Sequence, residues 1–256
     1  MSFSVFPDSS KIRNDHVTLI WRPSELYGLL MFEILRNPAG RAGLVTLAKK
    51  VDGTCALPDN GADNSSFLLE QRRLINGFAG EYMGNNEKRG RIYTWVPLHL
   101  SDAANNCSPR SFLTAWKKAA EHHPAPVGKA IDHLGLLDGV RSASTSRLAE
   151  LYEDYVWIRP TLDALRRQFV PIERQKLFDL WIEKDVIRTI IQNAAEDARN
   201  EPVGFSSGDQ LNALLAAMKS VAVMEERKNG KINVPDIYRV EAEILRKGGV
   251  AVPKRG

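Results

Sequence analysis

The sequence predicts a mostly α-helical protein with a small β-sheet near its C-terminal end. Apolar residues recur at helical spacing through most of the 256 residues, and proline or glycine marks the ends of these segments. Residues 221–234 differ, because two short apolar runs flank the pair Asn229-Gly230. This dipeptide readily adopts the two positive φ angles of a type I′ turn, so we expect a β-hairpin there.

The surroundings of this hairpin make a more specific prediction. A helix over 210–219 is expected just before it, with Asp209 as the N-cap. A helix, a hairpin and a basic flank are together typical of the wing of a winged helix-turn-helix module, although a hairpin at the edge of an α+β domain fits the same pattern. The basic residues that could contact nucleic acid or a protein partner are Arg227, Lys228, Lys231, Arg239, Arg246 and Lys247.

The rest of the chain is expected to be a series of helices. Pro23 begins the first helix, which ends at 37–40, and Ser108 followed by Pro109 is the clearest helix start. Further helices are predicted over 67–82, 127–138, 144–153, 161–168 and 173–199, with a loop over 51–66 and a short extended segment over 92–96. Small residues near position 140 suggest a boundary between a helical region, 1–140, and a winged-helix region, 141–256.

Composition and charge point to an ordinary globular protein of the cytoplasm. Hydrophobic residues make up 43% and charged residues 26%, and the net charge of +4 favours nucleic-acid binding only where the cations cluster. The two cysteines, Cys55 and Cys107, have no CxxC spacing and suggest a reducing compartment. The first residues lack an apolar signal segment, and apolar stretches fall short of the ~20 residues that span a bilayer, so we expect no membrane partner.

Motifs for catalysis or metal binding are absent from the sequence. The five histidines have no HExxH or related spacing, and neither a Gly-x-Ser-x-Gly elbow nor a Cys–His–Asn arrangement is present. We therefore expect no catalytic and no metal-binding residues. His99, Asp102 and Arg110 are the one group from which an unrecognised enzyme could be built, although a surface His–Asp pair explains the first two equally well.

Arg110 is the candidate for contact with a phosphate. It lies in the first turn of the helix that begins after Ser108, where the helix dipole is positive. A helix N-terminus with an arginine beside it suits an anion, typically a phosphate. An exposed arginine in a first turn, without a ligand, gives the same pattern.

Three segments carry a resemblance to a known family. They are YTWVPLHLSDA at 93–103 with SPRSFL at 108–113, the stretch over 15–27, and GKINVPDIYR at 230–239 with GGV at 248–250. Together they resemble the region after the nucleotide-binding core of bacterial P-loop ATPases of the AAA and STAND-like, chromosome-partitioning type. The resemblance implies a helical, ATPase-lid-like region followed by a winged helix. It also implies that Arg110 is a nucleotide sensor, because a Pro-Arg pair at the start of a lid helix has that role in the family.

The chain departs from the family in its phosphate-binding motifs. The Walker A lysine and the Walker B acid are absent, and the pairs Gly128-Lys129 and Gly230-Lys231 lack the glycine before them and the Ser/Thr after them. Without these groups little stabilises phosphoryl transfer, so we expect no ATP hydrolysis by this chain and no cofactor of its own; ATP belongs to the family it resembles.

The leading hypothesis is a non-catalytic regulatory and interaction region of a P-loop ATPase system. It would sense a nucleotide held by an ATPase core on another polypeptide and bind a protein or DNA partner through its winged helix. The alternative is a stand-alone winged-helix DNA-binding regulator. The helix over 210–219 offers only Gln210, Asn212 and Lys219 for base contacts, so any DNA binding is expected to be weak and non-specific.

Overall fold

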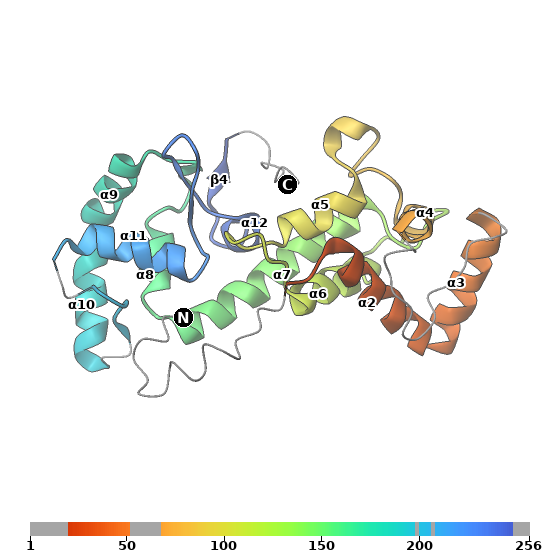
Figure 1. Ribbon diagram of the computed structural model, residues 1–256, viewed down its shortest axis with the longest axis horizontal. Coiled ribbons are helices and arrows are strands. Elements are labelled where there is room, and N and C mark those ends of the chain that lie inside the picture. Colours follow the sequence, from red (N-terminus) through yellow and green to blue (C-terminus); the bar gives the residue numbers. More distant parts are fainter. Residues whose placement is uncertain (1–19, 52–67, 198–199, 206–207, 248–256) are drawn as a thin grey trace.

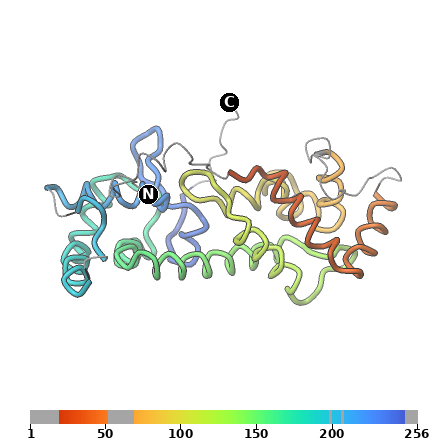
Figure 2. The backbone as a smooth tube through the Cα atoms, turned by 60° about the horizontal axis from the view of Figure 1, so that its bottom comes forward, coloured from red at the N-terminus to blue at the C-terminus, as the bar shows by residue number. Residues whose placement is uncertain are grey.

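The computed structural model describes residues 20–51, 68–197, 200–205 and 208–247. This part of the chain is mostly helical with two very small sheets, as the sequence predicts. The molecule is elongated, and its longest helix, α7 (His133–Asp154), runs along one side and joins the two ends (Figures 1 and 2). None of the described helices is both long and apolar enough to cross a lipid bilayer.

Among the described residues of the N-terminal half, five α-helices and one 3-10 helix precede α7. They are α2 (Pro23–Arg36), α3 (Pro38–Val51), α4 (Leu68–Ala79), η3 (Glu87–Arg89), α5 (Ile92–His99) and α6 (Pro109–Ala120). Helices α2 and α6 begin where the sequence predicts, and the predicted loop over 51–66 lies almost wholly outside the described residues.

Helix α3 was not predicted, because Asn37 and Pro38 were interpreted only as the end of α2. The Asn37 side-chain Oδ1 accepts the backbone N–H of Ala39 at 2.9 Å, and Pro38 is the first helical residue. Asparagine at an N-cap and proline at the first position start a helix as readily as they end the one before it.

The prediction of an extended segment over 92–96 is wrong, because these residues belong to α5. Its aromatic and β-branched residues suggested a strand, but a short apolar run does not distinguish a strand from a buried helix. Ile92, Val96 and Leu100 are buried four residues apart, which is the spacing of one helix face.

The two helices predicted over 127–138 and 144–153 are a single helix, α7, which begins at the N-cap Asp132. It packs closely on α6 because two glycines face that helix. A Cβ atom at Gly139 would lie 2.1 Å from the Ala115 carbonyl oxygen, and one at Gly135 would lie 2.7 Å from that of Ala119. The boundary predicted near residue 140 falls inside α7, so the predicted regions 1–140 and 141–256 share this helix.

The C-terminal half carries the remaining helices and the strands. They are α8 (Ile158–Asp163), β1 (Phe169–Val170), α9 (Arg174–Glu183), α10 (Val186–Glu196), α11 (Gln210–Ser220), β2 (Glu225–Glu226), β3 (Ile232–Asn233), α12 (Asp236–Arg239) and β4 (Leu245–Arg246). The predicted helix over 173–199 is broken into α9 and α10 at Asp185, whose φ of 52° is left-handed. Asp209 caps α11 as predicted, accepting the N–H groups of Leu211 and Asn212.

The predicted hairpin is present, but its turn is not the predicted type I′ turn. Strand β2 pairs antiparallel with β3, and the Arg227 N–H donates to the Lys231 carbonyl at 2.9 Å, which leaves a three-residue loop. Gly230 alone adopts a positive φ, 75°, so the turn is of the bulged three-residue kind and not type I′. Val223 and Ile232 are buried, and Val221 directly follows the end of α11, so the hairpin starts later than residue 221.

Further contacts link the strands and the core. Strand β1 pairs parallel with β4, and Ile172 forms an antiparallel bridge with Ile232 of the hairpin. In the N-terminal half, Tyr27 of α2 stacks on Tyr93 of α5 at 4.4 Å and meets Phe112 of α6 edge-on at 5.0 Å. The buried apolar residues form one cluster that continues from this aromatic group through α7 into the C-terminal half.

Candidate functional site

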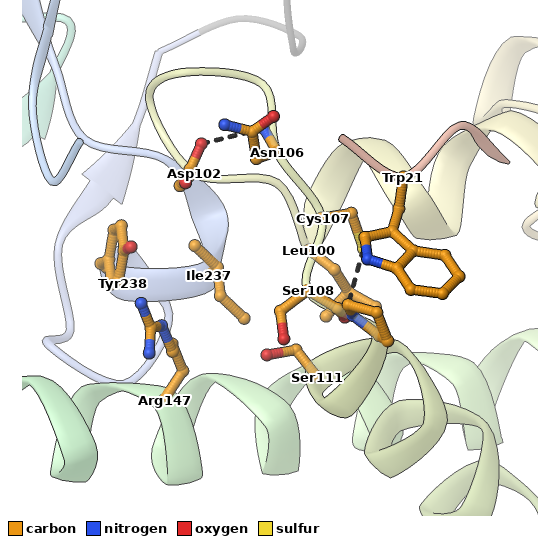
Figure 3. A pocket seen from close by; sticks show the side chains of 11 residues that line it. Trp21, Leu100, Asp102, Asn106, Cys107, Ser108, Ser111, Arg147, Ile237 and Tyr238 are labelled. Carbon is orange, nitrogen blue, oxygen red and sulfur yellow. Dashed lines mark hydrogen bonds between the residues drawn. The ribbon is translucent and has the colours of Figure 1, made fainter. Parts of the chain in front are cut away.

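A pocket of about 210 Å³ lies in the middle of the molecule, at the N-terminal end of α6 (Figure 3). Four separate parts of the chain form its walls: the segment before α2, the loop between α5 and α6 with the first turn of α6, helix α7, and helix α12. Its lining residues are Trp21, Leu100, Asp102, Asn106, Cys107, Ser108, Pro109, Ser111, Arg147, Ile237 and Tyr238.

One wall of the pocket is built from groups that donate hydrogen bonds. The first-turn N–H groups of a helix have no partner within the helix. The N-cap Ser108 makes no side-chain capping bond, and the Ser111 hydroxyl has no hydrogen-bond partner among the described residues although Ser111 is only 7% exposed. Figure 3 shows both hydroxyls directed into the same space, which Arg147 borders. Such a set of donors suits an anion.

Arg147 supplies the positive charge of this pocket. It reaches from α7, donates to Glu150 at 3.2 Å and also hydrogen-bonds the Tyr238 hydroxyl. Burial raises the pKa of Tyr238, so this hydroxyl is neutral at pH 7. A guanidinium has five N–H donors, and these two contacts leave others for a ligand.

Arg110, the residue predicted to sense phosphate, lies beside the pocket and not among its lining residues. It is at the N-terminal turn of α6 as expected, but its side chain is 79% exposed and pairs with Glu150 at 2.6 Å. Arg147 pairs with the same carboxylate from the pocket side. The sequence therefore indicates the right helix end, while the arginine that faces the pocket comes from another helix.

The rest of the lining offers an acceptor, Asp102, and an aromatic ring, Trp21, which lies beside the start of α6 (Figure 3). Asp102 accepts the backbone N–H groups of Ala104 and Asn106, each at 2.9 Å, and burial raises its pKa. Burial also raises the pKa of Cys107 to about 12, so its thiol stays protonated and is a poor nucleophile at neutral pH. Trp21 lies at the edge of the pocket.

His99 and Asp102 do not form the pair that the sequence allowed, because His99 faces Asp236 instead. Its Nε2 lies 3.4 Å from Asp236 Oδ2, its Nδ1 lies 2.8 Å from the Trp95 carbonyl oxygen, and its ring stacks on Trp95. Asp236 is only 4% exposed and is held by Arg239 Nε at 2.7 Å and Arg246 Nη1 at 2.8 Å. We call these four residues, His99, Asp236, Arg239 and Arg246, the Asp236 cluster.

This cluster changes the interpretation of the basic C-terminal residues. Arg239 and Arg246 are directed toward a buried carboxylate and do not form a surface for nucleic acid. Lys231 pairs with Glu173 at 2.7 Å, and the Lys247 ammonium lies over the ring of Phe169. Arg227 lies near Glu225 at 3.9 Å, while the exposed Lys228 has no ion-pair partner among the described residues.

In the described ranges, no three His, Cys, Asp or Glu side chains are grouped so that they could hold a metal ion. Comparisons with protein-family models, with curated proteins and with solved structures find no match to this chain.

The environment of His99 predicts a pH dependence of stability. Burial lowers the pKa of His99, so the unfolded chain takes up this proton at a higher pH than the folded chain does. The stabilisation by neutral His99 is complete above about pH 6.5 and is lost as the pH falls below it. We expect the free energy of unfolding to fall less steeply between about pH 7.5 and 5.5 in His99→Asn than in the wild type, measured by urea unfolding.

The exposed His123 provides the control, since His123→Asn removes a histidine without touching the cluster. Its pH dependence should match that of the wild type. If the free energy of unfolding falls equally steeply with pH in His99→Asn and in the wild type, His99 does not contribute to the pH dependence of stability.

Proposed function

We propose that the pocket at the start of α6 binds the terminal phosphate of a nucleotide held by another polypeptide. The observation that carries this proposal is the convergence of Ser108, Ser111 and Arg147 on one space at a helix N-terminus. Hydroxyl and guanidinium donors at the positive end of a helix dipole are the groups that recognise phosphate.

The size of the pocket favours a sensor over a complete nucleotide site. Sites that enclose a small molecule have volumes of about 300–1,000 Å³, and this pocket has about 210 Å³. It admits a phosphate group and leaves the rest of a nucleotide to another protein. Asp102 would accept a hydrogen bond from the ligand, and Trp21 at the edge of the pocket would cover it.

This proposal supports a regulatory role in a P-loop ATPase system, with no catalytic step in this chain. Neither the buried thiol of Cys107 nor the His99–Asp236 pair has the geometry of an activated nucleophile, which needs a base within about 2.6–3.2 Å. The partner that the proposal requires is an ATPase core in trans.

The test compares Arg147→Gln with Arg110→Gln, because both arginines pair with Glu150 but only Arg147 lines the pocket. Inorganic triphosphate and ATP are titrated into the purified chain, and the backbone amide resonances of residues 108–112 are followed by NMR. We expect binding in the millimolar range that Arg147→Gln weakens by about tenfold or more, since a hydrogen bond to a charged group contributes about 1.5–3 kcal/mol.

Arg110→Gln should change the affinity by no more than about twofold, as exposed surface positions usually do. An equal loss of affinity in both variants would indicate that Arg110 also contacts the ligand, or that the net positive charge alone attracts it. Absence of any shift at residues 108–112 with either ligand would contradict the proposal.

We also propose that the C-terminal part is a winged helix that binds a protein partner. The supporting observation is the isolated Ile172–Ile232 bridge, which joins the segment just after β1 to β3 of the hairpin. A protein is favoured over DNA because most cations here are paired with acids, Lys219 with Glu226 among them.

Charge reversal tests this preference. We expect the chain to bind a labelled DNA duplex weakly or not at all at physiological salt in fluorescence anisotropy, with no sequence preference. Lys228→Glu combined with Lys231→Glu should then have no effect at that salt concentration. Tight binding that the double substitution abolishes would show instead that the hairpin contacts DNA.

A further inference from the structure

A larger cavity lies between α3, α4 and residues 128–131. Helices α3 and α4 are at the end of the molecule away from α9 and α10 (Figure 1). The volume of the cavity is about 570 Å³, within the range of about 300–1,000 Å³ that is typical of binding sites. Leu44, Leu47, Phe78 and Ile131 contribute apolar surface, and Lys129 is the one charged residue among the described residues that line it. We call it the α3–α4 groove.

Glycines give the groove its shape. A Cβ at Gly77 would lie 2.9 Å from Leu47 Cδ1, so the absence of a side chain lets α4 approach α3 closely. A Cβ at Gly43 would have no atom within 4 Å, so the space beside this residue is open. The groove is therefore closed along one side by helix packing and open at the middle of α3.

The surroundings of the groove are basic and are not neutralised. Helix α3 carries three cations and no acid: Arg41 and Lys50 flank the face that lines the groove, whereas Lys49 lies on the far side with Ala42, and Lys129 of the lining adds a fourth cation. None of the four forms an ion pair within the described part of the chain. Lys50 follows Gly43 by seven residues, so both lie on the same side of α3.

An exposed apolar residue precedes the lining of the groove in the sequence. Val127 is 99% exposed and directly precedes Gly128 of the lining. Single exposed apolar residues are ordinary, but one beside an apolar groove is available to a partner that binds there.

We propose that the α3–α4 groove binds an acidic amphipathic helix of a partner protein. An apolar face placed in such a groove, with anchors at i, i+3, i+4 and i+7, is a recurring mode of peptide recognition. The cations around the rim select a helix whose polar face carries Glu or Asp, because complementary charge sets specificity and speeds association. A small molecule fits less well, since such sites usually present several polar groups that fix its orientation.

The test uses two labelled peptides of about 18 residues, with leucine at the four anchor positions and either Glu or Lys at the remaining ones. Fluorescence anisotropy with the full chain should give micromolar binding of the acidic peptide, weakened by salt, and at least tenfold weaker binding of the basic one. Lys50→Glu with Lys129→Glu should reverse this preference.

Gly43→Leu places a side chain in the open part of the groove and raises the helix propensity of α3, so the protein should remain folded. It should abolish binding of the acidic peptide. Ala42→Leu, an exposed position on the far side of the same helix, is the matched control and should change the affinity by no more than about twofold.

The proposal is overturned if the acidic peptide does not bind, if the basic one binds equally well, or if Gly43→Leu and Ala42→Leu behave alike. A dimer in sedimentation experiments that Gly43→Leu dissociates would also overturn it, because a second copy of the chain would then occupy the groove.

Discussion

The buried carboxylate of Asp236 is the constraint on which the middle of this structure depends. It is 4% exposed and meets Arg239 and Arg246, so it joins α12 to β4, and His99 brings α5 to the same point. A carboxylate without these partners would be costly at this depth, since removing one partner of a buried ion pair destabilises by about 3–5 kcal/mol. The next residues, Ile237 and Tyr238, line the pocket, so the cluster fixes one of its walls.

Helix α7 and its glycines determine how the two ends of the molecule are placed. Close packing at Gly135 and Gly139 holds α6 against α7, which brings the N-terminal turn of α6 to Arg147. The Glu241 N–H donates to the Ser144 hydroxyl at 3.1 Å, and this bond holds the segment after α12 on α7. The pocket thus lies between two rigid contacts, whereas the α3–α4 groove is at one end, where a partner can approach it without disturbing them.

Local signals in the sequence predicted the elements that depend on local chemistry, namely the starts of α2, α6 and α11 and the hairpin near Gly230. Long-range packing decided the rest. The Ser-Pro pair marks the N-terminal end of α6, where we propose that a phosphate binds, but nothing near position 147 in the sequence shows that this arginine meets it. The basic character of Arg239 and Arg246 also does not reveal that both face a carboxylate. Both pair with Asp236 only once α12 and β4 have folded and packed together.

The most direct test of this account is hydrogen–deuterium exchange of Asp236→Asn compared with the wild type. Asparagine keeps the size of the side chain and removes the charge that holds both arginines. We predict faster exchange over residues 95–108 and 236–247, while α3, α4, α9 and α10 keep their protection, because only the elements joined by Asp236 lose a partner. Unchanged exchange in both segments, or uniform acceleration along the whole chain, would contradict the central role of Asp236.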